Sequence, residues 1–213
     1  MKSIIGLIIF AFISICIIGI YSFTKFEDEE YIYWSKDRLL TLADFKGEPP
    51  REFANSTTIA LIQCSWEYNL TKKEIIGKNK MHKNESWVRK DLKTDEYILK
   101  YGIVDVEKTL SHEQLHFNIS ELYLRKFKKE YLRETQNLMI PPSSKIKSIF
   151  YDFRIKNKDR DRLFDKETNF SFNYKEHERW SIMIENELDE LKDYSGTLEE
   201  IIELIKNRNS EKQ

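Results

Sequence analysis

Cysteine, proline and glycine are all scarce in this 213-residue chain, with two, four and six residues. Cys16 lies in the first apolar stretch and Cys64 stands alone in another, so the sequence offers no disulfide between two parts of one folded domain and no Cys-x-x-Cys pair for zinc. We expect Cys64 to be a small core residue. The scarcity of glycine and proline, with 33% charged residues, favours a compact, helix-rich domain.

An excess of positive charge is also missing. The chain has 35 Lys and Arg against 36 Asp and Glu, a formal net charge of -1. Domains that bind nucleic acid usually carry a basic excess, so we expect no nucleic-acid partner. A hydrophobic fraction of 40% suffices for one well-buried domain. Because no repeat or low-complexity linker interrupts it, we predict one domain at 25–205, with a polar tail at 206–213.

The chain does have a long apolar run at its start. No charged residue occurs between Lys2 and Lys25, and roughly 20 apolar residues are enough to cross the ~30 Å core of a bilayer. We predict that 1–24 is an uncleaved membrane anchor. A cleaved signal peptide is the alternative, although its apolar stretch is usually shorter and ends in small residues. Lys2 favours a cytoplasmic N-terminus. The domain is therefore expected to be exported, periplasmic or extracellular, and secreted if the segment is cleaved.

Patterns of period two predict strands in the first half of the domain. The segment 30–34 is rich in aromatic and β-branched residues, and 57–68 alternates apolar with polar residues. A third strand and a turn around Asn84 are expected within 73–88. Between the first two strands, Gly47 and the proline pair after it predict a loop.

Helical patterns follow from about Thr94. One helix is expected before Gly102 and a long one from about Val104, which "IPPSS" at 140–144 ends; Ser143 or Ser144 can cap the next helix. A last helix begins near Tyr174 and can restart after Gly196. Strands followed by helices predict an α+β fold, with a short antiparallel sheet and then a helical half.

The long helix contains two of the four histidines, within "HEQLH". His112 and His116 are four residues apart and so share one helix face. Leu115 and Ile119 belong to the same apolar stripe, so both imidazoles are expected to point inward. Glu113 is turned about 100° from His112. In metallopeptidases with this spacing the histidines bind zinc and the glutamate is the general base.

The metal in such a site has two roles. It lowers the pKa of its bound water toward about 7, which creates a nucleophile, and it polarises the scissile carbonyl. The alternative interpretation of the motif is a pair of core histidines beside a surface glutamate, with no metal. An inward-facing pair on a helix of an exported domain favours the metal, and Zn²⁺ is the predicted cofactor.

The segments around the pair resemble a known family. The motifs are "SHEQLHFNISELYLRKFKKEY", the earlier "WSKDRLLTLADFKGEP" and the later "FDKETNFSFNYKEHERW", covering about 34–184. They are similar to the bacterial domain-of-unknown-function family 922, whose members are described as predicted secreted zinc-dependent proteases. The resemblance implies a zincin-like fold and a peptidase activity. It leaves the substrate open between a peptide and a cell-envelope component.

The chain departs from this family at two positions. Asn118 stands where many members have aspartate; if that carboxylate orients a metal ligand, Asn118 would do so more weakly. Phe170 stands where members often have a histidine. A catalytic zinc takes three protein ligands and keeps one open position, so the third ligand would be lost if the family histidine supplies it.

Three other residues are candidates for the third ligand, namely Asp165, Glu167 and His177, and a site without a third ligand is also open. Asp165 could instead only shape a turn, and His177 could be a surface residue. Glu121 lies about half a helical turn away from His112 and is expected to pair with Arg125 or Lys126. His82 is expected to be exposed to solvent, Trp66, Trp87 and Trp180 to be core residues, and the basic run 125–133 to be a solvated helix face.

The prediction from sequence is an exported, membrane-anchored zinc metallopeptidase, in which His112 and His116 bind zinc and Glu113 activates water to attack an amide bond. The alternative is an inactive envelope protein that keeps the fold for binding or scaffolding, which Phe170 favours. A structural metal with all positions filled by side chains is a third possibility. The sequence makes no prediction of the oligomeric state.

Overall fold

Residues 28–53, 56–67, 77–92, 94–95, 98, 103–135 and 143–210 are described by the computed structural model. The expected anchor at 1–24 lies outside these residues, and so does most of the helix expected before Gly102. Within the described ranges, no helix is both long enough and apolar enough to cross a bilayer.

The strands that the structure describes form two small antiparallel sheets. In the first, β1 (Tyr31–Tyr33) and β3 (Cys64–Glu67) flank β4 (Lys78–His82); in the second, β2 (Ala60–Leu61) pairs with β5 (Trp87–Val88). The single strand predicted at 57–68 is therefore two strands in different sheets. The chain changes sheet at Gln63, whose N–H donates to Ser86 Oγ and whose carbonyl accepts from His82 N–H, both at 2.8 Å.

The segment between β1 and β2 contains two short 3-10 helices, η2 (Leu42–Asp44) and η3 (Arg51–Phe53), where a loop was predicted. Gly47 follows η2 and donates its N–H to the carbonyl of Ser86 at 2.9 Å. A Cβ at this position would lie 2.7 Å from the carbonyl oxygen of Asn84. Only glycine therefore lets this segment approach the turn between β4 and β5 so closely.

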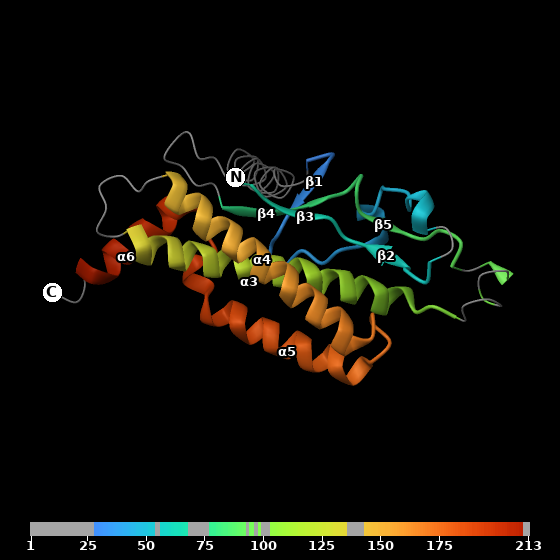
Figure 1. Ribbon diagram of the computed structural model, residues 1–213. Helices are drawn as coiled ribbons and strands as arrows, with labels where there is room; N and C mark the ends of the chain where they lie inside the picture. Colours follow the sequence, from blue (N-terminus) through green and yellow to red (C-terminus); the bar gives the residue numbers. More distant parts are fainter. Residues whose placement is uncertain are drawn as a thin grey trace, which may run out of the picture.

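In the second half, the described residues form four helices, and the α+β prediction is confirmed at this level. They are α3 (Val106–Thr135), α4 (Ser143–Thr168), α5 (Tyr174–Glu190) and α6 (Leu198–Ser210), with the 3-10 helix η4 (Lys192–Tyr194) before α6. The starts predicted near Val104 and Tyr174, and the restart after Gly196, agree with these bounds. Figure 1 shows α3 running through the centre, with the strands on one side, α5 on the other, and α4 crossing α3.

Because α3 is covered from several directions, it contributes to every part of the core. Phe117 packs beneath the first sheet with Ile32 and Met81, while Ile119 and Leu122 pack against α4 and α5. The three tryptophans predicted to be core residues are buried, which confirms that prediction. His82 was expected to face solvent, but its side chain is only 20% exposed and Nε2 lies 2.6 Å from Ser65 Oγ.

The basic run 125–133 is only in part a solvated face: Lys129 and Arg133 are exposed, but the prediction is wrong for Arg125 and Lys128. Arg125 is buried, pairs with Glu121 at 2.8 Å as expected, and donates to the carbonyl of Leu188 at 2.8 Å. Lys128 is fully buried and donates to the carbonyl of Gly196 at 2.8 Å. The last turn of α5 and the segment that leads from it to α6 cover this side of α3, and one carbonyl from each satisfies the two cations.

Burial of Lys128 predicts a dependence of stability on pH. Burial lowers the pKa of the Lys128 amine to about 8, although Glu121 opposes the shift. Between about pH 8 and 10.5 the unfolded chain binds the proton more tightly than the folded one, so the free energy of unfolding should rise with pH, by up to about 3 kcal/mol. Urea unfolding across this range should show the rise in the wild type and not in Lys128→Met. The exposed neighbour provides the control, Lys129→Met, and equal slopes in the two variants would contradict the prediction.

Candidate metal centre

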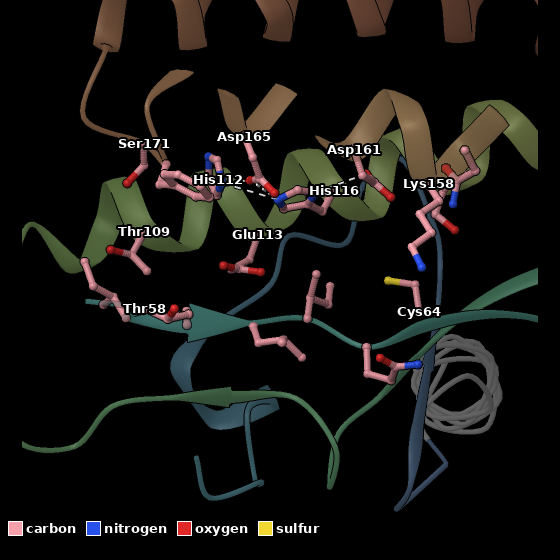
Figure 2. Close-up of a pocket in the computed structure, with 18 of the residues that line it drawn as sticks. Thr58, Cys64, Thr109, His112, Glu113, His116, Lys158, Asp161, Asp165 and Ser171 are labelled. Atoms are coloured by element: carbon pink, nitrogen blue, oxygen red, sulfur yellow. Dashed lines mark hydrogen bonds and ion pairs between the residues drawn. The ribbon is translucent and has the colours of Figure 1, made fainter. Parts of the chain in front are cut away.

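The two histidines of the motif lie on the side of α3 that packs against α4. His112 and His116 are one turn apart on α3, and Asp161 and Asp165 are one turn apart on α4. Figure 2 shows the two imidazoles and the two carboxylates meeting between these helices. His112 is buried, as expected from the apolar stripe of which it forms a part.

Three donor atoms converge at this contact. Asp165 Oδ1 lies 3.1 Å from His112 Nε2 and 3.1 Å from His116 Nε2, and the two nitrogens are 3.3 Å apart. Ligand atoms about 2.0–2.1 Å from a tetrahedral ion are separated by about 3.3 Å, so these separations are close to those of a filled site. The three residues form a group that could hold a metal ion.

The second aspartate sets the orientation of one ligand. Asp161 Oδ1 lies 3.0 Å from His116 Nδ1. When Nδ1–H donates to this carboxylate, the lone pair of Nε2 points toward Asp165 and is available to a metal, an arrangement common in metal sites. Phe164 packs against both rings, with centroids 4.4 Å from His112 and 5.0 Å from His116. The imidazoles are therefore held in place by packing as well as by hydrogen bonds.

The electrostatics of the group favour a positive charge between its carboxylates and imidazoles. Burial lowers the pKa of His116, but its hydrogen bonds to Asp161 and Asp165 outweigh this and hold the pKa well above its usual value. Burial raises the pKa of Asp165, yet the hydrogen bonds to both histidines hold it well below the usual range. Burial lowers the pKa of His112 to about 4. A proton on His116 supplies the positive charge, and a metal ion would compete with that proton.

Glu113 lies on another side of α3, facing the extended segment that contains Thr58 and leads into β2 (Figure 2). It is buried, and burial is the main cause that raises the pKa of its carboxyl to about 7. The N–H of Ile62, in the extended segment after β2, donates a hydrogen bond to this carboxylate. Glu113 is not one of the three converging groups, and its role as general base stays a prediction.

The group opens into a cavity of about 970 Å³. One wall is the extended segment 57–64, and the opposite wall is formed by α4 and the turn 169–172; His112, Glu113, His116 and Asp165 all line it. A pair of satisfied core histidines would have no such opening. The arrangement can therefore admit a ligand to the donor atoms and to Glu113 together.

Of the three candidates for the third ligand, the structure brings Asp165 to the histidines. Glu167 instead accepts from Trp180 Nε1 at 2.8 Å and pairs with Arg179. His177 is half-buried rather than a surface residue, with its ring 5.9 Å from that of His112. Among the described residues, His177 Nε2 and His112 Nδ1 are both buried without a hydrogen-bond partner.

The two departures from the family pattern have separate structural explanations. Asn118 accepts hydrogen bonds from Trp34 Nε1 at 2.8 Å and Gln114 Nε2 at 3.0 Å, so it contacts neither histidine; the carboxylate that orients His116 is Asp161, which sequence reasoning missed. Phe170 is 64% exposed and lies in the turn after α4, where its N–H donates to the carbonyl of Asp165 at 2.9 Å.

That turn has an unusual backbone. Asn169, Phe170 and Ser171 all have positive φ, at 48°, 51° and 75°. Each non-glycine residue in this region costs about 1 kcal/mol. The left-handed turn closes the last turn of α4 and so fixes the part of the helix that carries Asp165.

Comparisons with protein-family models, with curated proteins and with solved structures found no match for this chain. The resemblance to family 922 therefore stays a prediction from sequence. What can be said of function rests on the His112–His116–Asp165 group, Glu113 and the cavity that joins them.

Proposed function

We propose that this chain is a zinc-dependent hydrolase of amide bonds, of the metallopeptidase type, exported and held at the membrane by residues 1–24. The observation that carries the proposal is the convergence of His112 Nε2, His116 Nε2 and Asp165 Oδ1, at 3.1 to 3.3 Å from one another, in a cavity that Glu113 also lines.

The donor set favours zinc in a catalytic rather than a structural site. Zinc accepts imidazole nitrogen and carboxylate oxygen, and its structural sites are closed by four side chains, whereas catalytic sites use three and keep one position open. Over the residues that the structure describes, the group has three members, and it faces a cavity. Three ligands beside an open space match the catalytic type.

The residues around the proposed zinc site have different roles in amide hydrolysis. When bound, zinc would supply Lewis acidity toward water and toward the carbonyl of the substrate. Glu113 accepts a proton from water as the water oxygen bonds to the carbonyl carbon, and gives that proton to the leaving nitrogen as the C–N bond breaks. Asp161 and Phe164 keep His116 and His112 in position.

The binding or scaffold alternative rested on Phe170, because a missing third ligand would leave the site inactive. Asp165 provides a carboxylate oxygen against both histidines, and Phe170 lies in the turn beyond it. The position of Phe170 therefore no longer favours a protein without a metal.

Metal content of the purified chain tests the proposal. We expect about one zinc per chain in the wild type and none in His112→Ala/His116→Ala. His82→Ala is the matched control, because it removes a histidine outside the cavity and should keep the zinc. Absence of zinc from the wild type, even after zinc is added, would refute the metal site and the activity with it.

A further inference from the structure

One face of α4 carries four charged residues along the cavity. Arg154, Lys158, Asp161 and Asp165 follow one another at intervals of about one turn, and all four line the cavity. The two aspartates are bound to the histidines. Within the described part of the chain, neither Arg154 nor Lys158 forms an ion pair, so the face ends in two cations without a carboxylate.

The other cations in this part of α4 are paired. Lys156 pairs with Asp152 at 2.6 Å, Arg160 with Glu187 at 2.9 Å, and Arg162 with Asp159 at 3.5 Å. Between Asp152 and Arg162, pairing is thus the rule for the cations of α4, and the two exceptions in this stretch both lie on the cavity wall. The Arg154 guanidinium lies over the ring of Trp66, 5.1 Å from the centroid, which positions it without neutralising it.

A third polar group at the same end of the cavity lacks a partner. Asn157 lines the cavity and is only 7% exposed, and its Oδ1 has no hydrogen-bond partner among the described residues. A buried amide oxygen without a partner is costly, and a ligand N–H can satisfy it. Figure 2 shows Lys158 extending across this end of the cavity toward Cys64 on the facing strand.

We propose that Arg154, Lys158 and Asn157 form a subsite for a carboxylate of the substrate, which makes the substrate a peptide with a negative charge close to the bond that is cut. This inference rests on the proposed hydrolysis for the position of that bond. Two cations offer the carboxylate charge-assisted hydrogen bonds, and Asn157 offers an acceptor to a neighbouring peptide N–H.

The geometry sets the spacing between charge and scissile bond. Lys158 is two turns before Asp165 on α4, which is about 10 Å along the helix. An extended peptide covers that distance in about three residues. The carboxylate is therefore a C-terminal carboxylate or an acidic side chain about three residues from the bond that is cut.

The test compares three forms of N-acetylated peptides of mixed sequence: the free acid, the C-terminal amide, and the amide with one internal glutamate. For the zinc-loaded full chain we expect kcat/KM to be about 10- to 100-fold higher for peptides with a carboxylate than for neutral amides. Mass spectrometry should find the cut about three residues from the charge. A response to the free acid alone identifies the C-terminus as the source, and rescue by internal glutamate identifies a side chain.

The variant Arg154→Gln/Lys158→Gln should lose this preference, so that its kcat/KM is the same for charged peptides and for neutral amides. Lys156→Gln/Arg162→Gln removes the same charge from residues of α4 outside the cavity, and should keep the preference. Equal cleavage of charged and neutral peptides by the wild type would overturn the subsite while leaving the hydrolase standing. An equal loss in both double variants would also overturn it.

If the wild type cleaves no peptide, measurements of peptide affinity test the carboxylate subsite separately from the proposed hydrolysis. The affinity of the same peptides for zinc-loaded Glu113→Gln is measured with and without Arg154→Gln/Lys158→Gln. If Glu113→Gln binds the charged peptides more tightly than the neutral ones, and adding Arg154→Gln/Lys158→Gln removes this difference in affinity, the subsite is supported although hydrolysis has failed. Equal affinity for charged and neutral peptides, or no binding of either, overturns the subsite.

Discussion

Glu113→Gln is expected to keep the zinc and to lower kcat for amide hydrolysis by about 100- to 10,000-fold, the usual contribution of a general base. Glutamine has the shape of glutamate and its oxygen can still accept from the N–H of Ile62, so the local structure should persist. It cannot take a proton from water. Zinc content and kcat are measured on the same preparation, with thermal unfolding to verify the fold.

The control is Glu107→Gln, which removes a carboxylate in the first turn of the same helix without touching the cavity. It should change neither zinc content nor rate. A Glu113→Gln variant as fast as the wild type would exclude Glu113 as the general base, whatever its metal content. Loss of zinc from this variant would instead place Glu113 on the metal.

The histidine pair could be predicted because its geometry is local. Residues four apart on a helix share a face whatever the rest of the chain does, and the apolar residues around His112 indicated that this face is inward. The α+β order of elements and the starts of the long helices could be predicted for the same reason. Each depends on periodicity within one segment, and the structure agrees with them.

The remainder of the centre depends on how α4 packs against α3. Asp165 is 53 residues from His112, and Asp161 is 45 residues from His116. No spacing within the sequence relates such residues. The sequence could name Asp165 as one of three candidates, but only the helix contact distinguishes it from Glu167, which lies half a turn further along α4 and bonds to Trp180.

The error about the basic run has its physical origin in the coverage of α3. The basic run was read as a solvated face because lysine and arginine are usually exposed. Here the last turn of α5 and the connection to α6 cover part of that face, and backbone carbonyls at Leu188 and Gly196 satisfy Arg125 and Lys128. Charged residues along a helix predict an exposed face only when no other element packs on that face. Tertiary packing, which the helix sequence does not show, decides whether one does.

The position of Asp165 leads to a prediction with an effect as large as that of Glu113. Zinc sites with four ligands bind with about 10–16 kcal/mol, or about 3 kcal/mol for each ligand. Asp165→Ala should therefore weaken zinc binding by about 100- to 1,000-fold. Asp161→Asn, which only disturbs the orientation of His116, should weaken it by about 10- to 100-fold.

Glu167→Ala provides the matched control, because it removes a carboxylate from the same turn of α4 that makes its bonds to Trp180 and Arg179 instead. Its zinc affinity should equal that of the wild type, as measured by competition with a chelator. Asp165→His replaces the oxygen ligand at this position by an imidazole nitrogen. It should therefore keep part of the affinity that Asp165→Ala loses, because zinc accepts imidazole as readily as carboxylate. If Asp165→Ala keeps full affinity while His177→Ala loses it, the third ligand is His177, and the carboxylate beside the two histidines serves only to hold their protons.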